Sequence, residues 1–103
     1  GITLPAEPKD SVFVANVGKD ARQPAFLLCM QLRRSGVKAD CDHMLRSLKA
    51  QFRYADKAGF RLMLILGWDE LNKGIVKLKD MADGFEQEVS LASVDAAVKA
   101  KFC

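Results

Sequence analysis

The chain has 103 residues, half of them hydrophobic, and a formal net charge of +3. This length suits one domain with a single core, and so small a charge does not by itself indicate a nucleic-acid partner. Three widely spaced cysteines with one histidine argue against a metal site, and no apolar run is long enough to cross a bilayer. We therefore expect a soluble cytoplasmic protein with reduced thiols and no membrane partner.

The chain is expected to begin with a linker or a truncated domain boundary at residues 1–11, which hold two of the three prolines. The domain itself should span residues 12–103. Its first element is predicted at Val12–Val17, a short β-branched run that is typical of a buried strand and ends at a glycine. An amphipathic pattern from Asp20 to Ser35 then predicts a helix, with Pro24 tolerated in its first turn.

A second strand and helix should follow, because residues 37–41 alternate like a strand with one wet face. At about 100° per residue, the basic side chains of residues 46–57 fall in one stripe roughly 80° wide. We call this the cationic stripe, and it consists of Arg46, Lys49, Arg53 and Lys57. Leu48, Phe52 and Ala55 form an apolar stripe that should pack. On composition alone an ordinary solvated helix face is favoured for such a cationic stripe over an anion-binding role.

The run from Phe60 to Leu66 is almost continuously apolar and predicts a central strand covered by helices on both faces. The later elements are predicted as a short helix at 68–73, a strand at 75–79, a hairpin turn at Asp83–Gly84, a strand at 85–89 and a closing helix at 94–102. The whole pattern predicts a three-layer α/β fold. Its mixed sheet should have about five strands, including parallel ones, flanked by about three helices.

Few residues indicate chemistry. Gly18-Lys19 lacks the spacing of a phosphate-binding loop, and no spacing identifies a catalytic partner for His43. Cys29 lies in an apolar helical run, where a thiol usually packs as a small hydrophobe. Lys77 and Lys79 project to one side of their strand and add positive charge to the sheet.

Trp68 fits two roles. It is either a packed residue at the edge of the core, which its spacing favours, or an aromatic platform for a base.

Three segments, at 17–22, 46–57 and 66–80, together resemble the C-terminal anticodon-binding domain of class II aminoacyl-tRNA synthetases. The resemblance is strongest to the histidyl-tRNA synthetase family and spans about residues 12–102. It implies an anticodon-binding-domain-like fold whose partner is the anticodon stem-loop of histidine tRNA. A separate class II catalytic domain of the same polypeptide would use ATP and magnesium, so no catalytic residue or cofactor is expected in this chain. The full-length enzyme would be a homodimer.

The resemblance also assigns residues. By position, Glu70 is similar to the acidic anticodon-reading residue of the family and Lys79 to its basic partner, while residues 46–51 match the signature turn and helix start. The complete set of expected tRNA-binding residues is Glu70, Lys79, Arg46, Lys49, Arg53, Lys77 and Trp68. Such a carboxylate can accept from a base edge, and the basic side chains can neutralise phosphates.

Two other functions remain open at this stage. One is a synthetase-like regulatory module that senses tRNA or binds a partner without aminoacylation. The other is an independent small α/β enzyme that uses Cys41 or His43.

Overall fold

The computed structural model describes residues 11–41 and 47–102. In these residues five strands form one mixed sheet with the order β2-β1-β3-β4-β5. The strands are β1 (Ser11–Val17), β2 (Lys38–Cys41), β3 (Leu62–Gly67), β4 (Ile75–Asp80) and β5 (Glu86–Ser90). β1 runs parallel to both β2 and β3, whereas β4 is antiparallel to β3 and to β5. The predicted mixed α/β sheet is confirmed.

The described residues contain four α-helices, and the sequence predicted a helix at or near each of them. They are α1 (Arg22–Arg34), α2 (Leu48–Ala58), α3 (Trp68–Lys73) and α4 (Val94–Phe102), and two 3-10 turns precede α1 and α4, η1 (Lys19–Ala21) and η2 (Leu91–Ser93). The short helix predicted at 68–73 is confirmed as α3, which has the predicted bounds. None of the helices in the described ranges is both long and apolar enough to span a membrane.

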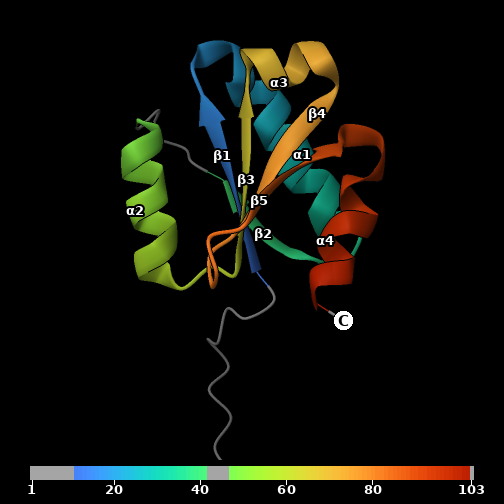
Figure 1. Ribbon diagram of the computed structural model, residues 1–103. Coiled ribbons are helices and arrows are strands. Elements are labelled where there is room, and N and C mark those ends of the chain that lie inside the picture. The colour runs from blue at the N-terminus through green and yellow to red at the C-terminus, as the bar shows by residue number, and fades with distance from the viewer. Residues whose placement is uncertain (1–10, 42–46, 103) are drawn as a thin grey trace, which may run out of the picture.

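The helices form two unequal layers around the sheet. Figure 1 shows α1 and α4 on one face and α2 on the other. The larger core lies under α1 and α4 and includes Leu32, Leu64 and Val98, whereas the smaller core lies under α2 and is centred on Phe13 and Met63. Among the described helices, α2 is the one on this side of the sheet, where it contacts β1 and shares the smaller core with Met63 of β3 (Figure 1).

Local signals explain where α2 begins and ends. The Ser47 hydroxyl oxygen accepts a hydrogen bond from the Ala50 N–H at 3.2 Å, which caps the first turn. Gly59 ends the helix with φ 84°, a left-handed conformation that suits glycine. Leu48 was expected to pack but is 38% exposed, because it is the first residue of the helix.

β3 begins two residues later than predicted. The Phe60 N–H still bonds to the Ala55 carbonyl at the end of α2, and the Arg61 N–H bonds to the Ser11 carbonyl before the regular ladder starts at Leu62. The apolar pattern includes Phe60 because its ring packs against the α2 core. The apolar pattern therefore identified Phe60 as a packed residue, whereas the backbone hydrogen bonds determine that β3 begins at Leu62.

Candidate nucleic-acid interface

The uncovered part of the sheet on the α2 side carries two lysines. Lys77 and Lys79 of β4 lie on this side, while Val76 and Leu78 are buried in the opposite core, as the alternation predicted. In the antiparallel register Lys79 faces Glu86 and Lys77 faces Glu88 on β5. We call this surface the open face, and it comprises Ile65, Lys77, Lys79, Glu86 and Glu88.

Lys79 connects the open face with α2. Its Nζ lies 4.2 Å from the centroid of the Phe52 ring and 3.6 Å from the Glu86 Oε2. The ring face and the carboxylate both stabilise the ammonium group. The Lys79 side chain is only 21% exposed, so the ammonium is held in a defined position rather than free in solvent.

Glu70 joins the start of α3 to the open face. One carboxylate oxygen accepts a hydrogen bond from the Gly67 N–H at 2.9 Å, and the other lies 3.9 Å from the Lys77 Nζ. A carboxylate in this place also suits the positive end of the helix. The structure therefore brings Glu70 together with Lys77, while Lys79, the other residue that the family resemblance assigned to anticodon reading, pairs with Glu86.

The cationic stripe lies along the outer side of α2. Lys49, Arg53 and Lys57 are exposed, and in the part of the chain that the structure describes none of the three forms an ion pair. Lys49 precedes Phe52 by three residues, about 60° around the helix, so it flanks the open face. Arg46, the fourth member, lies outside the described residues.

Trp68 does not pack, and the role that its spacing favoured is wrong. The residue is 60% exposed. It is the first residue of α3 and directly follows Gly67, the last residue of β3, so it stands at the rim of the sheet. An exposed indole can stack on a nucleic-acid base.

One important residue was missed by the sequence reasoning. The Gln51 side chain is fully buried, and its amide bonds to both the N–H and the carbonyl of Asn16, at 3.0 and 2.8 Å. The signal was present, because Gln51 shares the inward side of α2 with the buried Ala55, four residues later. A polar residue on a packed helix face needs a hydrogen-bonding partner.

The two described cysteines lack the exposure that a catalytic thiol needs. Cys29 and Cys41 are both buried in the larger core. Burial raises the pKa of the Cys29 thiol to about 12, and the neighbouring Cys41 adds to this rise. Cys29 therefore packs as predicted, and the buried Cys41 is no accessible nucleophile. His43 lies outside the described residues. Within the described residues no cluster of three metal-binding side chains occurs.

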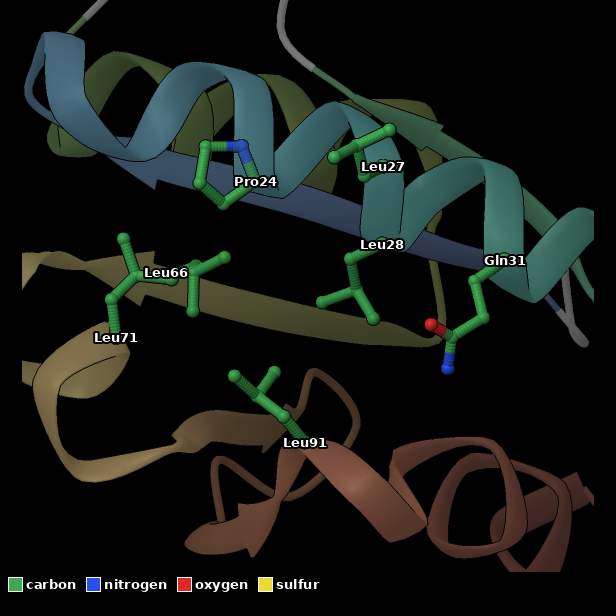
Figure 2. A pocket seen from close by; sticks show the side chains of 7 residues that line it. All are labelled: Pro24, Leu27, Leu28, Gln31, Leu66, Leu71 and Leu91. Atoms are coloured by element: carbon green, nitrogen blue, oxygen red, sulfur yellow. The ribbon is translucent and has the colours of Figure 1, made fainter.

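A pocket of about 240 Å³ lies on the other face of the sheet, between α1, the end of β3, α3 and η2. Figure 2 shows its largely aliphatic lining, formed by Pro24, Leu27, Leu28, Gln31, Leu66, Leu71 and Leu91. The amide of Gln31 donates to the Asp95 Oδ1 at 2.7 Å, so this polar group is already engaged. The pocket has no basic lining residue and is separated from the open face by the sheet.

The family model described as "Anticodon binding domain" matches residues 11–101. The chain belongs to this anticodon-binding domain family. As a member of it, the chain has histidine–tRNA ligases among its sequence relatives. It is 41% identical over 101 residues to the ligase of Desulforamulus reducens, and 45% identical over 94 residues to that of Pelotomaculum thermopropionicum. These matches cover 98% and 91% of the chain.

Solved structures agree with this family. The anticodon-binding domain described here matches the histidyl-tRNA synthetase of Nostoc sp. PCC 7120 with a TM-score of 0.88 and 32% identity over 99% of the chain. It also matches the RNA binding domain of the threonyl-tRNA synthetase of Cryptosporidium parvum, with a TM-score of 0.80 over 94% of the chain and 25% of that protein. At 18% identity the latter match supports the fold alone.

The chain spans only part of these relatives. It covers 24% of the D. reducens ligase, 22% of the P. thermopropionicum ligase and 24% of the Nostoc structure. The anticodon-binding domain thus corresponds to about a quarter of a histidine–tRNA ligase.

Proposed function

We propose that this domain binds the anticodon stem-loop of histidine tRNA and positions the tRNA for aminoacylation by a separate class II catalytic domain. The observation that carries the proposal is the arrangement around the open face. Lys77 and Lys79 lie on a half-covered sheet beside a helix whose exposed cations have no described acidic partner. Flat, partly apolar surfaces bordered by cations suit single-stranded RNA, whose bases and phosphates lie on different sides.

The residues divide between affinity and specificity. Lys49 and Arg53 neutralise backbone phosphates along α2, which favours binding of any RNA. Glu70 and Lys79 read base edges on or beside the open face, because a carboxylate accepts from exocyclic amino groups and an ammonium donates to base carbonyls. Trp68 stacks on a base at the rim of the sheet.

The proposal extends to the parent protein. Histidine activation with ATP and magnesium would take place in the catalytic domain, and the polypeptide would act as a cytoplasmic homodimer. In this proposal the domain's own contribution to aminoacylation is placement of the tRNA. In this proposal the catalytic domain binds the acceptor end of the tRNA, and the anticodon-binding domain binds the anticodon.

A direct titration tests the proposal. The domain is titrated with the histidine-tRNA anticodon stem-loop and with a loop-substituted stem-loop at two salt concentrations. Trp68 is the only tryptophan and is exposed, so its fluorescence reports on the interface, and RNA mobility gives an independent reading. Tighter, salt-sensitive binding of the first RNA is expected. Equal affinity for both RNAs, or no binding in either assay, contradicts anticodon recognition by this domain.

A further inference from the structure

The cations around the open face are of two kinds. On α2, Lys49 and Arg53 are exposed and form no ion pair within the described residues. On β4, each lysine has a carboxylate beside it: Lys79 is 3.6 Å from Glu86, and Lys77 is 3.9 Å from Glu70. A model in which all basic residues bind phosphates alike does not explain this difference.

The Lys79 ammonium is held from two directions. The Phe52 ring centroid lies 4.2 Å from the Nζ, and the Glu86 carboxylate approaches from the neighbouring strand. The ladder register fixes this neighbour, because Glu86 is directly opposite Lys79 in the β4–β5 pair. The Lys79 side chain retains 21% exposure, so it is not fully enclosed by these two neighbours.

Such an ammonium discriminates between ligands by their charge. It has three N–H donors, so it can keep Glu86 and still donate to a neutral acceptor such as a guanine or uracil carbonyl oxygen. A phosphate that approached the same ammonium would come close to the Glu86 carboxylate and be repelled by it. The cations of α2 impose no such penalty on a phosphate.

We propose that Glu86 is a specificity-determining residue that reserves Lys79 for neutral acceptor atoms of bases and directs the phosphate backbone toward α2. This inference rests on the proposed function, since it assumes that RNA occupies the open face. Glu86 acts through Lys79 and need not touch the RNA. Its removal therefore strengthens binding while weakening discrimination, which is the opposite of losing a favourable contact.

The test compares the wild-type chain with Glu86→Gln, using the histidine-tRNA anticodon stem-loop and its loop-substituted control. Glu86→Gln is expected to raise the affinity for the control RNA by about threefold to fivefold, the size of effect expected when one surface ion pair is released. The cognate stem-loop gains less, so the preference falls. The log–log salt slope for the control RNA steepens by about 0.7, because Lys79 now binds a phosphate of a single strand.

Two further variants isolate the pair. In a Lys79→Gln background, Glu86→Gln should no longer change the preference or the salt slope. Asp83→Asn removes one negative charge from the same hairpin and keeps the oxygen that accepts from the Phe85 N–H, so it controls for overall charge. It should leave the preference as in the wild type. Circular dichroism of each variant checks the fold.

The outcomes separate the inference from the proposed function. The inference is overturned if Glu86→Gln and Asp83→Asn raise the affinity for both RNAs by the same factor, because the effect is then one of net charge. It is also overturned if Glu86→Gln has the same effect in the Lys79→Gln background. An unchanged preference in Glu86→Gln overturns it as well. If the wild-type chain shows no preference for the cognate stem-loop, the proposed function fails first, and the inference falls with it.

Discussion

The side-chain amide of Gln51 in α2 pairs with both backbone polar groups of Asn16 in β1, at 3.0 and 2.8 Å. The β2 ladder ends opposite Val14, so Asn16 lies two residues beyond the last pair on that side. Gln51 supplies there the donor and acceptor that a longer β2 would provide. The contact links residues 35 positions apart and fixes the helix that carries the cationic stripe against the sheet.

Replacing Gln51 with leucine is expected to destabilise the domain, because two buried backbone groups of Asn16 lose their partner. Each group left unpaired costs about 1–3 kcal/mol. Chemical denaturation measures the change in the free energy of unfolding. Gln23→Leu, the same substitution at an exposed position of α1, is the control and should change stability little. Equal stability of the two variants would contradict the role of the amide.

Gly67→Ala is expected to disturb the junction of β3 and α3 for lack of space. The backbone of Gly67 has φ −132°, which any residue adopts, but an added Cβ would lie 2.9 Å from the Glu70 Oε1 and 3.3 Å from the Val17 Cβ. The carboxylate is the end of a flexible side chain and can move aside, so the expected cost is mainly the loss of its hydrogen bond from the Gly67 N–H, about 0.5–1.5 kcal/mol. Thermal unfolding measures it. In a Glu70→Ala background the cost should shrink, and an unchanged cost would show that the carboxylate is not what obstructs the methyl group.

Glu70 carries two roles that two substitutions separate. Glu70→Gln keeps an oxygen that can accept from the Gly67 N–H but removes the charge that faces Lys77, whereas Glu70→Ala removes both. Glu70→Gln should therefore change the preference between cognate and loop-substituted RNA with little loss of stability, and Glu70→Ala should also destabilise α3. Binding titrations and thermal unfolding measure the two effects. Equal loss of affinity for both RNAs would refute the reading role.

Lys49→Ala is expected to weaken cognate and control RNA by the same factor, because a phosphate contact carries no base information. The log–log salt slope should become shallower by about 0.7 to 0.9, the value for one phosphate contact. Lys99→Ala on α4, on the opposite side of the sheet, is the matched control and should alter neither quantity. A selective loss of cognate binding in Lys49→Ala would instead assign this lysine to a base.

Cys29 should make the stability of the domain sensitive to alkaline pH. Its pKa is raised by burial from 9.0 to about 12 in the folded chain. Above pH 9 the unfolded chain loses the thiol proton while the folded chain keeps it, so stability falls as pH rises from 9 towards 12. The slope for this group is at most about 1.4 kcal/mol per pH unit. Denaturation at pH 8 to 10.5 should show a steeper fall for wild type than for Cys29→Ala, and parallel curves would contradict it.

The sequence predicted the elements whose side chains alternate between core and solvent. β4 is an example, because the alternation of Val76 and Leu78 with Lys77 and Lys79 follows directly from the period of a strand. Element boundaries were less accurate, since Phe60 is packed like a strand residue but bonded like the end of a helix. Trp68 was misassigned because hydrophobicity does not reveal that no described element covers the rim beyond β3.

The partners within the site depend on register, which hydrophobic pattern alone does not determine. Glu86 faces Lys79 only because the hairpin pairs these two residues, and the sequence reasoning placed the turn without deriving its pairs. Glu70 and Lys79 came from the family resemblance, and the structure adds that Glu70 lies beside Lys77 and Lys79 beside Glu86. Gln51 was overlooked because its role depends on where β2 stops.

β5 is an edge strand, and its composition also bears on aggregation of the domain. One side of its backbone pairs with β4, and among the described strands none lies on the other side. An unpaired edge is a template on which a second chain can add a strand and begin aggregation. Glu86 and Glu88 put two negative charges on this short edge, where an incoming copy of β5 would meet its own carboxylates. Replacing both would therefore be expected to affect how long the domain stays monodisperse at high concentration.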